Sequence, residues 1–233
     1  MSDQARAGAE VWVVVPAYNE GAIISETLAS LTALPYRVVV VDDGSADDTW
    51  ERARDAGATV LRHACNLGQG AALQTGFTYA LRQRDTGYVV SFDADGQHNA
   101  ADIPRMLAPL LQGDCDVTLA SRFAPGGVAN DIPASKKFAL RLAVLLARAM
   151  NGLPLTDTHN GLRAFTAAAA RQISLSQNGM AHASEILSQI ASRKLRFREV
   201  PATVRYTAYS RAKGQSLSNG LNIIWDILMA RIR

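Results

Sequence analysis

The stretch RVVVVDDGSADDT, residues 37–49, places four consecutive valines directly before a run of acidic and small residues. The valines predict a short buried strand, because β-branched side chains favour strands. Asp47 and Asp48 suit the start of a following helix, since acidic side chains stabilise a helix N-terminus. The earlier stretch VWVVVPAYNE, residues 11–20, has the same order of apolar run, turn residues and helical pattern. The two stretches therefore predict two successive strand–turn–helix units.

Two further units follow along the chain. The segment TVLRH (59–63) runs into NLGQGAALQTGFTYA (66–80), where a glycine-containing turn precedes a helix predicted over 71–84. The apolar run at 88–92 is the fourth strand. Strands that recur at intervals of roughly 25 residues, each followed by a helix, indicate a mostly parallel sheet with crossover helices. The fold class predicted is α/β.

In such a sheet, ligands bind outside the carboxyl ends of the strands. The stretch SFDADGQH (91–98) places two aspartates, one residue apart, directly after the fourth strand. Two carboxylates at this spacing can reach one hard divalent cation, and a cation there would neutralise a diphosphate leaving group. The alternative is a pair of aspartates in a surface turn, but their place at the sheet edge favours a metal site. Five acidic residues are predicted at this edge: Glu20, Asp42, Asp43, Asp93 and Asp95.

The motifs VVPAYNE, VDDGSADDT, NLGQGAAL, FDADGQH, SRF (121–123) and DTHNGLRAF (157–165) occur in this order. Together they resemble the family 2 glycosyltransferases, and within them the polyprenyl-phosphate (dolichol-phosphate) mannose and glucose synthases. The resemblance extends from residue 11 to residue 216. It implies a glycosyltransferase A-type fold, with a single Rossmann-like, mostly parallel sheet flanked by helices. A dinucleotide-binding dehydrogenase is disfavoured, because Gly-x-Gly-x-x-Gly does not follow the first strand.

The resemblance also implies a donor site for a UDP- or GDP-sugar with a bound Mg²⁺ or Mn²⁺ ion. It implies that three residues hold the metal, namely Asp93, Asp95 and Gln97, with Asp95 counted among the catalytic residues. The residues that match nucleotide-binding positions of the family are Pro16, Tyr18, Glu20, Val41, Asp43, Asp93 and Ala94.

On the acceptor side, the resemblance implies that Arg122 contacts a phosphate and that Asp157 lies near the acceptor. Lys213 matches a lysine that binds the lipid phosphate. The arginine expected a few residues before it is replaced by Thr207, and Arg205 and Arg211 are the two alternatives for that contact.

Composition and charge limit the other possibilities. Apolar residues make up 48% of the chain and charged residues 19%, which excludes disorder. Cys65 and Cys115 have neither metal-ligand nor disulfide spacing, and no N-terminal signal or membrane-spanning stretch is expected. The first 135 residues hold 9 Lys and Arg against 17 Asp and Glu, whereas the remainder hold 15 against 4. This basic excess suits an anionic membrane surface; nucleic acid is not expected, since no recognition motif is present.

Two basic segments have amphipathic patterns, residues 136–152 and 217–233. Each can lie in a membrane interface or pack on the sheet or on a partner subunit. The domain organisation expected is a glycosyltransferase domain over 1–216 followed by a C-terminal amphipathic helix over 217–233.

These observations lead us to expect a metal-dependent inverting glycosyltransferase that acts on polyprenyl phosphate. We expect it in the cytoplasm, peripheral on the inner face of the cytoplasmic membrane, with a small membrane protein as a possible partner. One alternative is transfer to a sugar hydroxyl in surface polysaccharide synthesis, with Asp157 as general base. A second alternative is a non-catalytic nucleotide-binding scaffold.

Overall fold

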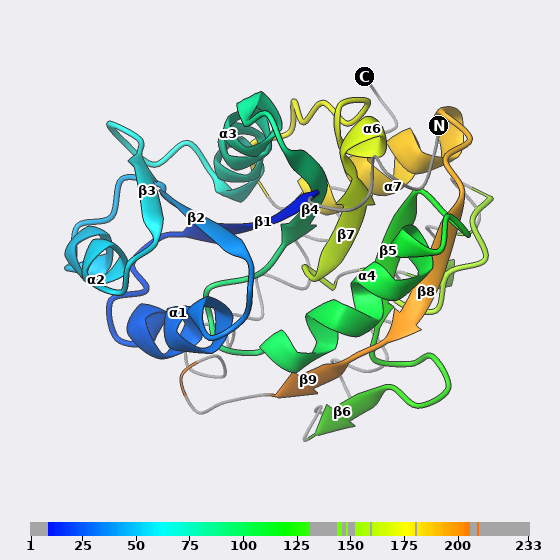
Figure 1. Cartoon of the computed structure of the whole chain (residues 1–233), viewed down its shortest axis with the longest axis horizontal. Helices are drawn as coiled ribbons and strands as arrows, with labels where there is room; N and C mark the ends of the chain where they lie inside the picture. Colours follow the sequence, from blue (N-terminus) through cyan, green and yellow to red (C-terminus); the bar gives the residue numbers. More distant parts are fainter. Residues whose placement is uncertain are drawn as a thin grey trace.

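The structure, a computed structural model, describes residues 9–130, 144–145, 148, 152–158, 160–179, 181–205 and 209. Within these residues the chain folds around a seven-stranded sheet of order β3-β2-β1-β4-β7-β5-β8 (Figure 1). Its strands are β1 (Glu10–Ala17), β2 (Arg37–Asp42), β3 (Thr59–Arg62), β4 (Thr86–Ser91), β5 (Val117–Ser121), β7 (Arg163–Thr166) and β8 (Phe197–Pro201). A small second sheet pairs β6 (Val128–Asn130) with β9 (Thr203–Arg205).

The main sheet is mostly parallel, as the sequence predicts. Strands β3, β2, β1 and β4 run parallel to one another, and β5 runs parallel to β8. The exception is β7, which is antiparallel to both of its neighbours, β4 and β5. Because β7 is reversed, the residues that precede it lie at the same edge as the carboxyl ends of β1, β2 and β4. This edge is where the sequence predicts the ligand site.

Helices cover both faces of the sheet (Figure 1). In β1, Val13 and Val15 belong to one apolar cluster while Trp12 and Val14 belong to the other, as the two-residue period of a strand requires. The first cluster includes side chains of α1 and α4, and the second includes side chains of α3, α6 and α7. The helices are α1 (Ile24–Thr32), α2 (Thr49–Asp55), α3 (Gln69–Arg82), α4 (Ile103–Leu111), α6 (Ala167–Ala170) and α7 (His182–Ser192), with a 3₁₀ turn at Ala100–Asp102 before α4.

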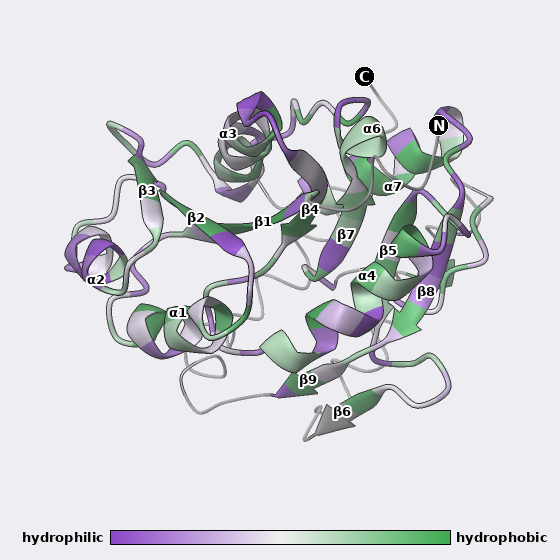
Figure 2. Cartoon of the chain, viewed as in Figure 1, coloured by the Kyte–Doolittle hydropathy of each residue, from purple (hydrophilic) through white to green (hydrophobic). Residues whose placement is uncertain are grey.

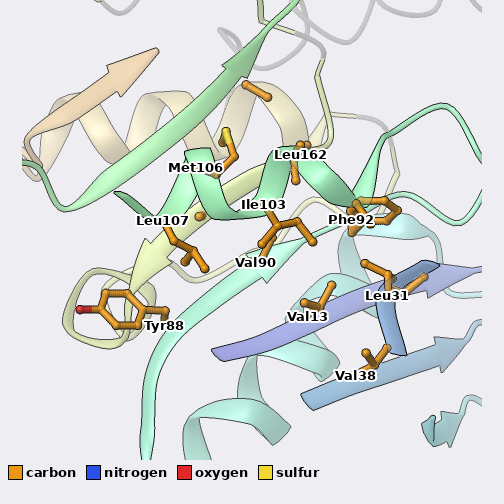
Figure 3. Packing of buried hydrophobic residues seen from close by; sticks show 14 of the residues in the cluster. Val13, Leu31, Val38, Tyr88, Val90, Phe92, Ile103, Met106, Leu107 and Leu162 are labelled. Carbon is orange, nitrogen blue, oxygen red and sulfur yellow. The ribbon is translucent and has the colours of Figure 1, made fainter. Parts of the chain in front are cut away.

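The first cluster lies between the sheet and the pair α1 and α4. Figure 3 shows Val13, Val90 and Ile103 close together in it, and the two valines and the isoleucine are fully buried. In the hydropathy colouring of Figure 2, the strands in the centre are mostly apolar, whereas polar residues lie on the outer helices. Burial of each such side chain contributes about 1.5–3 kcal/mol. The sheet is therefore a rigid support for the polar loops at its carboxyl edge.

The segments expected to meet a membrane are mostly outside the described residues. This holds for the whole tail 217–233 and for all of 136–152 except four residues. Of these four, Val144 is buried, Leu145 is exposed, and the Arg148 guanidinium donates to the Leu155 carbonyl at 2.6 Å. No helix in the described part of the chain is long and apolar enough to cross a membrane.

Helix α3 begins two residues earlier than the sequence predicts, at Gln69. Gly68 precedes it with a φ of +101°, a conformation that glycine adopts at low cost, whereas Gly70 lies inside the helix. Gly76, near its middle, faces β1, and a Cβ there would overlap the Cγ1 atom of Val14. The close contact between α3 and the sheet therefore depends on this glycine.

We predict that Gly76→Ala lowers the free energy of unfolding by about 1–3 kcal/mol, because the added methyl overpacks the contact with Val14. Without that overlap, the substitution would stabilise the helix by up to about 1 kcal/mol. Urea unfolding measures the difference. Gly179→Ala is the matched control, since nothing lies within 4 Å of a Cβ there. Equal stability of Gly76→Ala and wild type would contradict the prediction.

Candidate active site

The five acidic residues predicted at the sheet edge have different partners. Asp42, at the end of β2, is fully buried, and its Oδ2 atom lies 3.0 Å from Nε of Arg62. Asp43 accepts hydrogen bonds from the His63 ring (2.7 Å) and from the backbone N–H groups of Leu67 (2.9 Å) and Gly68 (2.7 Å). Asp42 therefore pairs with an arginine of the neighbouring strand, while Asp43 shapes the loop before α3.

The residues expected to bind the nucleotide meet where β1 and β2 end. Pro16 and Val41 are register partners in the two parallel strands. Tyr18 is 41% exposed, while Glu20 is buried and accepts a hydrogen bond of 2.8 Å from the Tyr209 hydroxyl. That hydroxyl also lies 3.1 Å from the Asn19 carbonyl oxygen. The structure thus groups the expected nucleotide residues and adds Tyr209 from the far end of the chain.

The Asp93 carboxylate is held from two sides. Its Oδ1 atom accepts from the Gln69 amide at the start of α3 (3.0 Å), and its Oδ2 atom lies 3.0 Å from Nε2 of His98. The backbone of Gly161 packs directly against it, so a Cβ at Gly161 would overlap both carboxylate oxygens. These contacts fix Asp93 in one orientation toward the loop before β7.

Asp95 is held by its own turn. Its Oδ1 atom accepts from the Gln97 backbone N–H (3.1 Å) and its Oδ2 atom from the Gln97 side-chain amide (2.7 Å). Ala94, between the two aspartates, is buried, and its carbonyl accepts from the Thr27 hydroxyl of α1 (3.1 Å). The expected metal-binding residues therefore lie together in one turn that is fastened to α1 and α3.

The two aspartates differ in pKa. Burial, followed by the negative charge of Asp93, raises the pKa of Asp95 to about 6. Burial also acts to raise the pKa of Asp93, but the His98 hydrogen bond and the positive charges of His98, His182 and Arg163 hold it below its usual value. Burial of His98 opposes its protonation, yet Asp93 and Asp95 raise its pKa overall. Of the two carboxylates, Asp95 is therefore the one whose negative charge the fold disfavours.

The described residues contain no group of three or more His, Cys, Asp and Glu side chains arranged to hold a metal ion. A Mg²⁺ site needs fewer protein ligands when substrate phosphates complete it, because one or two carboxylates then suffice. Asp93, Asp95 and the amide oxygen of Gln97 are hard oxygen donors of the required kind. The raised pKa of Asp95 fits the same interpretation, since a cation would relieve the repulsion between the two carboxylates. The residues present fit a divalent cation.

Arg122 and Asp157, expected on the acceptor side, form a buried ion pair. Nε of Arg122 lies 2.6 Å from Oδ2 of Asp157, and the Arg122 backbone N–H donates to the same oxygen at 3.2 Å. Glu199 of β8 accepts from the backbone N–H groups of Thr156 (2.7 Å) and Asp157 (3.1 Å). The pair is therefore fixed between β5, β8 and the loop before β7. Thr207, Arg211 and Lys213 lie outside the described residues.

Several residues of this site are not assigned by the sequence analysis. They are His63, Gln69, His98, Gly161, Arg163 and Tyr209. Gln69, His98, Gly161 and Arg163 lie inside the motifs quoted above. The sequence therefore indicates the segments in which they lie, but not the residues that they contact. Tyr209 gave no signal, because its contact with Glu20 spans 189 residues of sequence.

Comparison with known proteins gives the class. Glucosyl-3-phosphoglycerate synthase from Mycobacterium tuberculosis has a similar solved structure, with a TM-score of 0.73 and 23% identity over 97% of this chain and 82% of that one. The same enzyme was crystallised with Mn²⁺, UDP and glucosyl-3-phosphoglycerate, with a TM-score of 0.70 and 22% identity over 97% and 81% of the two chains. The fold is that of the A-type glycosyltransferases.

Sequence comparison is more specific. Glycosyl transferase family 2 matches residues 12–174. An undecaprenyl-phosphate mannosyltransferase from Micrococcus luteus is 32% identical over 242 aligned positions, covering 95% of this chain and 98% of its own length. An uncharacterized protein from Methanocaldococcus jannaschii is 37% identical over 229, covering 96% and 93%. The chain belongs to glycosyl transferase family 2 and is a transferase.

We predict that Asp95→Asn stabilises the metal-free protein above pH 6 by about 1–3 kcal/mol, because it removes a charge that the fold disfavours. The folded-state pKa of Asp95, about 6, exceeds its usual unfolded value of about 3.9. Its contribution to stability is therefore complete below pH 4 and is lost as the pH rises through 6. Urea unfolding in EDTA between pH 4 and pH 8 should show the free energy of unfolding of the variant rising relative to that of wild type as the pH increases. A constant difference across this range would contradict the assignment.

Proposed function

We propose that this chain transfers a sugar from a nucleoside-diphosphate sugar to a polyprenyl phosphate, with inversion at the anomeric carbon. The observation that carries the proposal is the turn that holds Asp93 and Asp95 at the carboxyl end of β4. It lies in a chain that is similar over almost its whole length to an undecaprenyl-phosphate mannosyltransferase. At this edge of the sheet, acidic oxygen ligands and the residues expected to bind the nucleotide lie together.

The donor half of the proposal rests on the ends of β1, β2 and β4. Pro16 and Val41 are buried, so the apolar surface offered to a base comes from Tyr18, which is 41% exposed, while Glu20 supplies a carboxylate that can accept from ribose hydroxyls. Asp93, Asp95 and Gln97 would hold Mg²⁺ or Mn²⁺, which supplies positive charge against the diphosphate leaving group. The same-fold enzyme crystallised with Mn²⁺ and UDP is the reason to include both in the test.

In the proposed reaction, an oxygen of the lipid phosphate attacks the anomeric carbon from the side opposite the nucleotide. The new carbon–oxygen bond forms as the bond to the β-phosphate oxygen breaks, and the electron pair leaves with the nucleoside diphosphate. The attacking oxygen is already anionic near neutral pH, so no proton has to be removed. The residues of the chain orient the two partners and exclude water.

The state of Asp157 favours a phosphate acceptor over a sugar hydroxyl. A hydroxyl acceptor requires a general base in contact with it. The Oδ2 atom of Asp157 is engaged by both the buried guanidinium and the backbone N–H of Arg122, so this carboxylate is directed to Arg122 rather than to an acceptor hydroxyl. We propose that Asp157 orients Arg122, and that Arg122 together with Lys213 and either Arg205 or Arg211 provides the positive charge near the acceptor phosphate.

We predict that the purified chain, supplied with UDP- or GDP-sugars and Mn²⁺, transfers labelled sugar to undecaprenyl or dolichyl phosphate. Asp95→Asn should lower transfer on the order of 10²–10³-fold, since an amide is a poorer ligand for a hard cation. Asp116→Asn is the matched control, because Asp116 pairs with the exposed Arg196 at the opposite edge of the sheet.

Three results of this assay would argue against the proposal. Product with sugar-hydroxyl acceptors alone would favour polysaccharide synthesis, and nucleotide binding without any transfer would favour a scaffold. Unchanged turnover of Asp95→Asn with metal present would contradict the assignment of Asp95 as a metal ligand.

We further propose that the chain binds the inner face of the cytoplasmic membrane peripherally, directly or with a small membrane protein. The support is the charge of residues 136–233, which hold 15 Lys and Arg against 4 Asp and Glu. We predict co-sedimentation with anionic vesicles that weakens with salt, since each basic residue near such a surface contributes about 1 kcal/mol. A chain that ends before Leu217 should bind less tightly. Equal failure to sediment with anionic and neutral vesicles would leave both basic segments as packing elements.

A further inference from the structure

Arg163 is a buried arginine whose bonded partners, among the described residues, are all backbone carbonyls. It is the first residue of β7 and is 4% exposed. Its guanidinium donates to the carbonyl oxygens of Asn160 (3.2 Å), Ala183 (3.3 Å) and Thr158 (3.4 Å). A buried charge is costly when no opposite charge is bonded to it. The position therefore requires an explanation beyond the stability of the fold.

Two carboxylates supply the compensating charge from a distance. Burial lowers the pKa of Arg163 to about 10, and the negative charges of Asp93 and Asp157 limit that decrease. Arg163 thus interacts electrostatically with the aspartate expected to bind the metal and with the aspartate expected near the acceptor.

The loop to which Arg163 is hydrogen-bonded also contacts Asp93. Arg163 binds the carbonyls of Thr158 and Asn160, and the next residue, Gly161, packs against the Asp93 carboxylate. The Gly161 carbonyl in turn accepts from the hydroxyl of Ser91, the last residue of β4, at 2.7 Å. Ser91 is also the register partner of Arg163 between β4 and β7. The loop between Asp157 and β7 is therefore fixed to the end of β4 by one guanidinium and one hydroxyl.

We propose that Arg163 is a positioning residue that links the donor side of the site to the acceptor side. It contacts neither substrate. Its planar fork of N–H groups sets the loop that joins Asp157 to Gly161. This inference rests on the proposed function, and the difference between the effect on kcat and the effect on Mn²⁺ affinity separates it from a general loss of structure.

The test compares Arg163→Lys with Arg163→Gln. Mn²⁺ binding without donor is measured by titration calorimetry, and kcat and donor KM are measured in the transfer assay. Lysine keeps the charge but cannot bond three carbonyls in a fork, so we expect Mn²⁺ affinity within about 2-fold of wild type and kcat at least about 10-fold lower. Glutamine has neither the charge nor the fork, so we expect kcat to fall at least as far, without loss of Mn²⁺ affinity, because a positive charge repels the cation.

Arg196→Gln is the matched control, since it removes an exposed guanidinium that bonds Asp116 and the Gly113 carbonyl at the opposite edge of the sheet. It should leave Mn²⁺ affinity and kcat unchanged. Gly161→Ala is a second probe, because it keeps Arg163 but displaces the Asp93 carboxylate, and it should weaken Mn²⁺ binding. Urea unfolding identifies any loss of stability common to the variants.

Wild-type kcat in Arg163→Lys would overturn the positioning of the loop, and this result decides the question even if Arg163→Gln does not fold. Wild-type kcat in a folded Arg163→Gln would overturn the same positioning role. Both results count against this inference alone, because wild type remains active in each. Failure of wild type to bind Mn²⁺ or to transfer sugar would instead overturn the proposed function, and this inference with it.

Discussion

The repulsion between Asp93 and Asp95, one residue apart in a partly buried turn, is the constraint on which the rest of the site depends. Removing carboxylates from water is costly unless hydrogen bonds and positive charges offset it. For Asp93 the compensation comes from Gln69, His98 and the nearby charge of Arg163. Asp95 accepts from two N–H groups of Gln97 and gains from the charge of His98, but burial and the charge of Asp93 outweigh these contributions and raise its pKa. The fold therefore leaves one carboxylate poorly compensated, at the point where a cation would stabilise it.

The reversed strand β7 provides much of this compensation. The parallel strands β1, β2 and β4 bring their carboxyl ends to one edge, and the helices that connect them cover the faces of the sheet. A fifth parallel strand beside β4 would place its own N-terminal residues at the far edge. Because β7 is antiparallel, the loop before it, with Asp157, Gly161 and Arg163 at the start of the strand, lies against Asp93 instead. One change of strand direction thus joins the acidic donor side to a second set of charged residues.

The sequence predicts the parts of this arrangement that depend on local pattern. Runs of β-branched residues predict β1, β2 and β4, and the order of motifs places Asp93 and Asp95 at the correct edge. It does not predict which charges pair, because Arg122 and Asp157 are 35 residues apart and Asp43 and His63 are 20 apart. Strand β7 has four residues, RAFT, which are too few to show a period, so its reversed direction gave no signal. The role that we propose for Arg163 follows only from its tertiary contacts.

The distribution of charge bears on the acceptor. In the described part of the site, Arg122 is paired with Asp157, whereas Arg163 is bonded only to carbonyls. In this part of the site the charges of Arg122 and Arg163 are matched by those of Asp157 and Asp93, so the attraction for an anionic acceptor comes from the basic excess of residues 136–233. A sugar hydroxyl would gain little from that excess, whereas an anionic phosphate would be attracted to it. An acidic half that would hold a cation and a basic half that would face an anion would account for both halves of the chain with the one reaction that we propose.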